Sequence, residues 1–197
     1  MLCSVSTRSC CVLAIVCLLN VLPAATGQLQ RGEPVGNLVL TGLGDYHHNL
    51  NNYAERPGTA ILFLSARCSV VEEQLRAIRE IHQKYRRKDI LFVGVVSDPE
   101  QSAGEIRDFM QKRGIIFPVY RDPEGSVKKR FGANVTPELF LLDQSGSLIY
   151  HGGLDRDESF QSLELAILSL LMQVPAVVPD TKARGTAIDV RLPAIER

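Results

Sequence analysis

The stretch Thr59–Cys68 reads Thr-Ala-Ile-Leu-Phe-Leu-Ser-Ala-Arg-Cys, and it indicates where a strand leads into a helix. Its first six residues are apolar or β-branched and follow Pro57-Gly58, which is typical of a buried strand. A helix is expected directly afterwards, over Val71–Arg87, because apolar residues recur there at helical spacing. Cys68 therefore lies where a strand leads into a helix, and the positive end of a helix dipole stabilises a thiolate.

The order of the other expected elements indicates one α/β domain. The continuous apolar run over residues 90–96 is typical of a strand in a parallel sheet that is covered on both faces. Patterning also predicts strands over 37–41, 117–120, 139–142 and 147–150, a polar loop over 42–52, and helices over 102–113, 126–132 and 159–172. A parallel start and an antiparallel finish, with helices between, predict a mixed sheet covered by helices.

The N-terminal segment predicts export. Arg8 supplies a positive charge, residues 10–19 are mostly apolar, and residues 23–27 offer small side chains for cleavage after Gly27. The apolar run is shorter than the roughly 20 residues that span a bilayer. We therefore expect a signal peptide over 1–27 and a periplasmic or extracellular protein, with a retained N-terminal membrane anchor as the alternative.

The rest of the chain divides into a domain and a tail. We expect the domain over residues 28–175 and an extended, weakly ordered C-terminal tail over 176–197, where prolines and charged residues dominate without periodicity.

Cysteine usage singles out one sulfur. Of the five cysteines, Cys3, Cys10, Cys11 and Cys17 lie in the expected signal peptide, so that cleavage leaves Cys68 alone. Exported proteins usually pair their cysteines. A single one indicates a reactive thiol or an intermolecular disulfide, which leaves open a disulfide-linked homodimer through Cys68. A buried, inert cysteine is the structural alternative.

Composition argues against several other classes of function. Lys+Arg and Asp+Glu are both 22, so the chain has no excess of positive charge that would favour binding to nucleic acid or to an anionic membrane surface. The four histidines lack the spacing of convergent metal ligands, so we expect no metal site and no cofactor.

Three motifs resemble the thioredoxin-like superfamily, and specifically its redoxin branch of the alkyl hydroperoxide reductase/thiol-specific antioxidant (AhpC/TSA) type. They are Phe63–Cys68, Val135-Thr136-Pro137, and the hairpin Leu142–Leu148, which is closed by Gly152-Gly153. The resemblance extends over about residues 35–172. It implies a thioredoxin-like α/β fold with a mixed central sheet and helices on both faces, preceded by the signal peptide.

The same resemblance implies roles for individual residues. Cys68 would be the nucleophile, with Ser65 and Arg67 as its catalytic neighbours. In thioredoxin-like proteins the proline that matches Pro137 is cis and packs against the reactive sulfur. The backbone of the residue before it, here Thr136, offers strand-like hydrogen bonds to a partner chain. Thr136 and Pro137 would therefore bind substrate.

Two departures from the family pattern limit the chemistry. Val71 stands where a Cys-x-x-Cys pair has its resolving cysteine, and the C-terminal stretch 184–188 holds no cysteine either. A mixed disulfide at Cys68 would therefore need an external thiol, either a thioredoxin-like protein or a low-molecular-weight thiol. The peroxidase motif is also incomplete, because Ile61 replaces its loop proline and Pro137 falls where its distant arginine belongs.

The sequence thus favours an exported thiol-dependent oxidoreductase with one reactive cysteine, acting on a disulfide-bearing protein or a peroxide. A weak one-cysteine peroxidase and a non-catalytic peptide-binding module are the alternatives.

Overall fold

The computed structural model of the 197-residue chain describes residues 28–51, 55–68, 70–155 and 158–188. The expected signal peptide, 1–27, and the end of the expected tail, 189–197, lie outside these ranges. Within them, no helix has both the length and the apolar character needed to cross a membrane.

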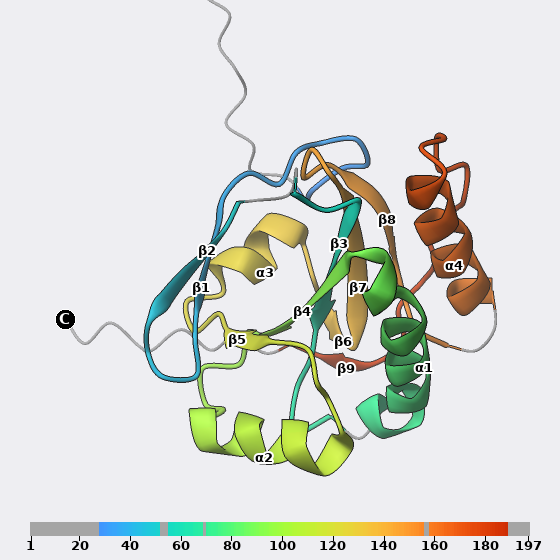
Figure 1. Ribbon diagram of the computed structural model, residues 1–197. Coiled ribbons are helices and arrows are strands. Elements are labelled where there is room, and N and C mark those ends of the chain that lie inside the picture. Colours follow the sequence, from blue (N-terminus) through green and yellow to red (C-terminus); the bar gives the residue numbers. More distant parts are fainter. Residues whose placement is uncertain (1–27, 52–54, 69, 156–157, 189–197) are drawn as a thin grey trace, which may run out of the picture.

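The described chain alternates strands and helices (Figure 1). The strands are β1 (Leu38–Thr41), β2 (His47–Leu50), β3 (Gly58–Phe63), β4 (Ile90–Val96), β5 (Val119–Arg121), β6 (Val135–Thr136), β7 (Glu138–Asp143), β8 (Leu148–Gly152) and β9 (Thr186–Ala187). The helices are α1 (Val70–Tyr85), the 3₁₀ turn η2 (Arg86–Lys88), α2 (Ala103–Arg113), α3 (Ser126–Phe131) and α4 (Glu158–Leu171).

Strand β3 lies inside a seven-stranded mixed sheet of order β2-β1-β5-β4-β3-β7-β8. It runs parallel to β4 and antiparallel to β7, and β4 runs parallel to β5. All six residues of β3 are buried, as its apolar sequence predicts for a strand with neighbours on both sides. The mixed sheet expected from the sequence is confirmed.

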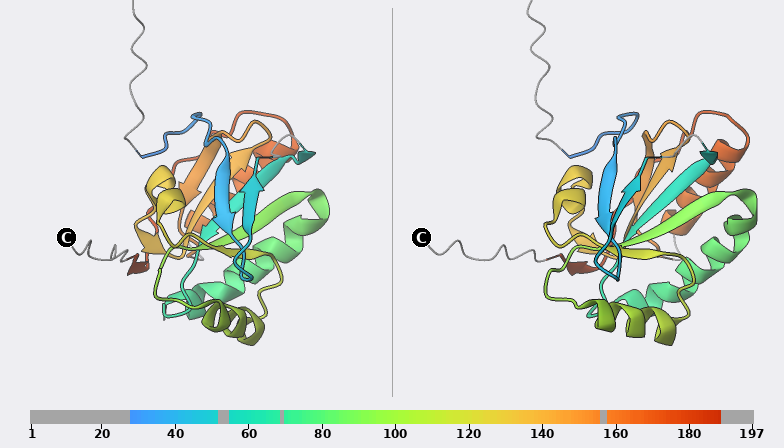
Figure 2. Two further views of the ribbon diagram at one scale, coloured as in Figure 1. Left: turned by 90° about the vertical axis from the view of Figure 1, so that its left-hand side faces the viewer. Right: turned by 60° about the vertical axis from the view of Figure 1, so that its left-hand side comes forward.

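Side chains of β3 point alternately into two cores. Ala60 and Leu62 pack in one core with apolar residues of α1, α2 and α4, whereas Ile61 and Phe63 pack in the other core with residues of α3. This alternation follows from the two-residue period of a strand. Figure 2 shows the result, with α3 on one side of the sheet and α1 and α4 on the other. Helices cover both faces, as expected.

The predicted loop over residues 42–52 is wrong in part, because it contains strand β2. Every residue of β2 pairs with β1 in antiparallel register, and His48 stacks on Tyr120 with ring centroids 4.9 Å apart. Strand β2 lies at one edge of the sheet, and Leu50 is its only buried residue. An edge strand that buries so little carries no apolar pattern, which explains why the sequence did not reveal it.

His82 belongs to the core side of α1 rather than to a polar site. Its ring lies 5.1 Å from Phe92 and 5.2 Å from Phe117 between centroids. Burial lowers the pKa of His82, and the nearby charge of Arg86 acts in the same direction.

Helix α2 begins at the capping box expected from the sequence. The Ser102 hydroxyl accepts a hydrogen bond from the Glu105 amide at 3.2 Å, and the Glu105 carboxylate accepts one from the Ser102 amide at 2.8 Å. Each bond satisfies a backbone donor that the first turn leaves unpaired. The helix ends at Gly114, whose φ of 63° is left-handed.

Replacing Ser102 by alanine is expected to lower the free energy of unfolding by about 1 kcal/mol, because the N-terminal cap is lost. Urea denaturation of the full chain measures the change. The matched control is Ser169→Ala on α4, where the hydroxyl only bonds back to the Leu165 carbonyl of its own helix. That control should stay within about 0.5 kcal/mol. Equal losses in both variants would contradict the capping role.

Candidate thiol site at the end of strand β3

Cys68 lies at the turn that joins β3 to α1. The Leu64 amide continues the sheet by donating to the Val95 carbonyl at 2.8 Å, and the Cys68 amide then donates to the Ser65 carbonyl at 3.3 Å to close the turn. Helix α1 begins at Val70. Cys68 carries a thiol and its residue is 5% exposed, so the sulfur is placed at the helix start but is covered.

The sulfur of Cys68 contacts the backbone just before Pro137. Its thiol donates to the Thr136 carbonyl oxygen at 3.1 Å, and the Thr136–Pro137 peptide bond is cis. The structure therefore brings together three residues that the sequence analysis had placed in one site. The second contact was not anticipated: the Thr186 hydroxyl lies 3.0 Å from Sγ.

Ser65 is held by a buried glutamine rather than by Cys68. Nε2 of Gln101 donates to the Ser65 hydroxyl at 2.8 Å and to the Asp98 carboxylate at 2.8 Å. Oε1 of the same side chain accepts from the Ala66 amide at 2.7 Å. Gln101 is 1% exposed, and both polar atoms of its side chain form hydrogen bonds around the turn. It therefore holds the backbone that leads to Cys68 in place.

Arg67 extends toward acidic side chains. Its guanidinium lies 3.1 Å from Glu105, 3.2 Å from Glu100 and 3.8 Å from Asp98. The hydrogen bond to Glu105 raises the pKa of Arg67. The pKa of Glu105 is lowered, first by the Ser102 amide and then by Arg67. The guanidinium charge is thus largely compensated, and Arg67 joins the turn to the start of α2.

Strand β6 is supported from behind by a buried carboxylate. Glu138 is 4% exposed, and its Oε2 accepts hydrogen bonds from the amides of Asn134 at 2.9 Å and Val135 at 3.4 Å. Its Oε1 lies 2.6 Å from Nε2 of His151, whose ring stacks on Phe140. This arrangement fixes the backbone that meets Cys68 and leaves the outer edge of β6 open for pairing.

That edge is occupied by the chain's own C-terminal segment. Residues 180–188, called the strap below, return across the molecule and contain β9, which pairs antiparallel with β6. The register places Ala187 opposite Val135 and Thr186 opposite Thr136. Figure 1 shows β9 beside β6, near the beginning of α1. The sequence does not predict this strand.

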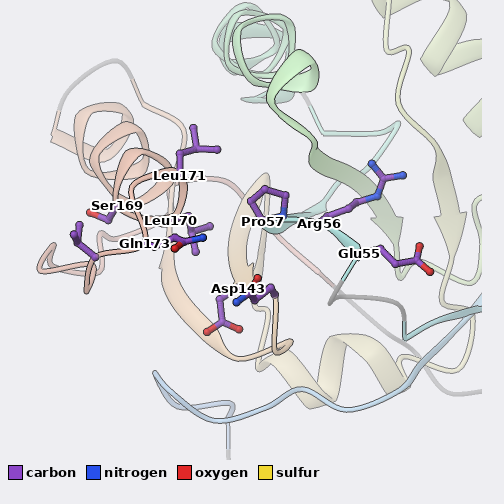
Figure 3. A pocket seen from close by; sticks show the side chains of 10 residues that line it. Glu55, Arg56, Pro57, Asp143, Ser169, Leu170, Leu171 and Gln173 are labelled. Atoms are coloured by element: carbon purple, nitrogen blue, oxygen red, sulfur yellow. The ribbon is translucent and has the colours of Figure 1, made fainter.

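Two cavities differ in their relation to the sulfur. A small one of about 130 Å³ adjoins the site and is lined by Leu64, Ser65, Arg67, Ser97, Asp98, Thr136, Thr186, Ala187 and Ile188. A larger one of about 500 Å³ lies where β3 begins, between Pro57, Asp143 and the end of α4 at Leu170 (Figure 3). Because Cys68 follows the other end of β3, the larger cavity is not part of the thiol site.

The described residues contain no group of three or more His, Cys, Asp or Glu side chains arranged to hold a metal ion.

Solved structures with this arrangement define the fold class. A hypothetical protein from Sinorhizobium meliloti superposes with a TM-score of 0.73 at 24% identity, over 82% of this chain and 95% of that chain. A putative thiol:disulfide interchange protein DsbE from Chlorobium tepidum superposes with a TM-score of 0.63 at 22% identity, over 73% of this chain and 99% of that chain. The protein has a thioredoxin-like α/β fold.

The family follows from the sequence match. The model of the AhpC/TSA family matches residues 32–151, which is more than half of the chain, so the chain belongs to that family. Curated relatives include the thiol-disulfide oxidoreductase ResA of Bacillus cereus, 25% identical over 122 residues, or 62% of this chain and 69% of that protein. The ResA of Geobacillus kaustophilus is 24% identical over 136 residues, or 68% of this chain and 76% of that protein.

Three residues of the site were missed by the sequence analysis. Glu138 left a signal, because it is a carboxylate at the start of the apolar run 139–142, where a charge is expected only if it has buried partners. Gln101 and Thr186 left none, since each is brought to the site by the fold from far along the chain.

Replacing Gln101 by leucine is expected to lower the free energy of unfolding by about 1–3 kcal/mol, because the partly buried Ala66 amide and Ser65 hydroxyl lose their hydrogen bonds to its side-chain amide. Urea denaturation measures the loss. Gln161→Leu, on the exposed side of α4, is the matched control and should stay within about 0.5 kcal/mol. A Gln101→Leu variant as stable as the control would show that the turn does not depend on this side chain.

Proposed function

We propose that this protein is an exported thiol–disulfide oxidoreductase of the thioredoxin-like AhpC/TSA type, with Cys68 as its single reactive cysteine. The observation that carries the proposal is the placement of Sγ at a strand-to-helix turn, 3.1 Å from the carbonyl of Thr136. That position puts the sulfur beside a strand edge on which a partner backbone can pair. Relatives named as thiol-disulfide oxidoreductases support the same reaction class.

The reaction would take place in two exchanges. The Cys68 thiolate attacks one sulfur of a substrate disulfide, the S–S bond breaks, and the second substrate sulfur leaves as a thiolate. This gives a mixed disulfide between Cys68 and the substrate. A second thiolate then attacks the mixed disulfide, forms a new disulfide with the substrate sulfur and releases Cys68 in its reduced form.

The second thiolate must come from another molecule. Cys68 is the only cysteine beyond residue 17, and Val71 occupies the position of a local resolving cysteine in α1. A thioredoxin-like protein or a low-molecular-weight thiol would supply the electrons. Disulfide-bearing proteins are the proposed substrates, in the extracytoplasmic compartment to which the N-terminal segment would direct the chain.

Replacing Cys68 by serine is expected to abolish exchange, because the hydroxyl cannot form a disulfide. The reference protein is the full chain with serine at positions 3, 10, 11 and 17, so that Cys68 is its only thiol. Reduction of bis(2-hydroxyethyl) disulfide by glutathione measures turnover, and mass spectrometry of the tryptic peptide Cys68–Arg76 detects the mixed disulfide. The Cys68→Ser variant should fall to the uncatalysed rate.

Two other outcomes would replace the proposal. Turnover that survives in Cys68→Ser would exclude the thiol as the reacting group. Sulfenic acid that forms at Cys68 with micromolar peroxide, in a protein that gives no mixed disulfide, would favour the one-cysteine peroxidase instead. In the absence of both reactions, the peptide-binding alternative would remain.

A further inference from the structure

The residue that should react is covered by a segment that is itself exposed. Cys68 is 5% exposed, yet both residues of β9 and the preceding Arg184 and Gly185 are exposed to solvent. The strap therefore lies over the sulfur as an outer layer. A disulfide substrate cannot approach Sγ along β6 while Thr186 stands in its path.

The strap also occupies the site in the manner of a bound strand. Thr186 is opposite Thr136 in the register, and its hydroxyl oxygen is 3.0 Å from Sγ. A substrate paired along β6 in the same register would present a cysteine sulfur at this place. Thr186 places a hydroxyl oxygen there instead of a sulfur. A hydroxyl cannot undergo thiol–disulfide exchange, so no reaction follows from the contact.

We infer that the strap, residues 180–188, is an autoinhibitory pseudosubstrate that covers Cys68 and must leave before a disulfide substrate can bind along β6. The inference rests on the proposed exchange reaction at Cys68 and concerns its regulation. The strap belongs to this chain, so its closed state competes with every substrate at a fixed effective concentration.

Small residues let the strap lie this close. A Cβ at Gly185 would fall 2.1 Å from the Thr136 carbonyl oxygen, a separation that real atoms do not reach. A Cβ at Gly153 would fall 3.1 Å from the Ala183 Cα, and one at Gly152 2.1 Å from the Thr181 hydroxyl. The tail and the end of β8 are thus fitted to each other along several residues.

Hydrogen bonds at both ends hold the strap in place. At one end, the His151 amide donates to Asp180 at 2.9 Å and the Thr181 amide donates to the His151 carbonyl at 3.1 Å. At the other end, the Ile188 amide donates to the Asn134 carbonyl at 2.9 Å, and Lys128 donates to the Ile188 carbonyl at 2.8 Å.

These contacts favour a strap that can open. They are hydrogen bonds, exposed or only partly buried, around a strand of two residues, and no residue between 180 and 188 is fully buried. Segments of this kind open locally at much lower free energy than the core of the domain. The strap can therefore exchange between a closed and an open state without unfolding of the sheet.

Gly185→Ala tests the closed state, because the added Cβ collides with the backbone of Thr136. The rate of Cys68 alkylation by iodoacetamide is followed on the tryptic peptide Cys68–Arg76 in the full chain. We expect an increase of roughly tenfold, equivalent to about 1.4 kcal/mol less favourable closure. The matched control is Gly104→Ala in α2, where a Cβ would have ordinary room 3.7 Å from Ser102, and its rate should equal that of the wild type.

Thr186→Cys tests the register by a covalent link. With serine at positions 3, 10, 11 and 17, oxidised glutathione should convert the Cys68 thiol and the new thiol into one disulfide, with two protons and two electrons passing to glutathione. The product is a cross-link between peptides 68–76 and 185–191. Predominant glutathione adducts at both positions, without the cross-link, would overturn the inference.

The experiments can reject the inhibitory role of the strap and the exchange reaction at Cys68 separately. If Gly185→Ala alkylates no faster than wild type and reduces bis(2-hydroxyethyl) disulfide at the wild-type rate, the strap is not inhibitory and the proposed function stands. If alkylation rises but neither protein forms a mixed disulfide, the strap does cover Cys68 and the exchange reaction is wrong.

Discussion

The contact between the sulfur of Cys68 and the carbonyl oxygen of Thr136 is the interaction on which the site depends. It joins residues 68 positions apart in the sequence across 3.1 Å. The sheet makes it possible, because β3 ends at the turn before Cys68, and β7, which follows Thr136 and Pro137, pairs with β3 in antiparallel register. Phe63 lies opposite Glu138 in that register, which brings the two loops to the same end of the sheet.

Much of this arrangement could be predicted from local sequence. The apolar run of β3 predicts a buried central strand. The capping box of α2 is formed by residues close together in the sequence, so it can also be predicted. Cys68, Thr136 and Pro137 were placed together through the family resemblance, and the structure brings them together. The sequence could not show which way the Arg67 side chain points. Its charge would suit a thiolate, but it pairs instead with Glu100 and with Glu105 of α2.

Elements that depend on tertiary pairing left no local pattern. Strand β2 is polar and lies at the sheet edge, and β9 has two exposed residues that become a strand only because β6 is there to pair with. Nothing in the local sequence distinguishes Gln101 from other polar residues, because its hydrogen-bond partners Ser65 and Ala66 lie far away in the chain. In each case the information lies in a partner that is distant in sequence, so periodicity and propensity cannot detect it.

We infer that the single thiol and the strap form one regulated site. If the cysteines at positions 3, 10, 11 and 17 leave with a signal peptide, as we propose, no internal disulfide can form at Cys68. In the proposed scheme Thr186 covers the sulfur reversibly, because its contacts are hydrogen bonds and no covalent bond has to be reduced for the strap to leave. Substrate, strap and external thiol would then compete for the same position beside β6, next to the sulfur of Cys68.

Hydrogen–deuterium exchange at the Ile188 and Thr181 amides tests this view most directly. The reduced chain is compared with the chain that carries a cysteine-containing peptide in mixed disulfide with Cys68. We expect both amides to be protected in the reduced protein, because they donate to the Asn134 and His151 carbonyls, and to lose protection in the mixed disulfide. Unchanged protection in a fully formed mixed disulfide would show that substrate reaches Cys68 without displacing the strap.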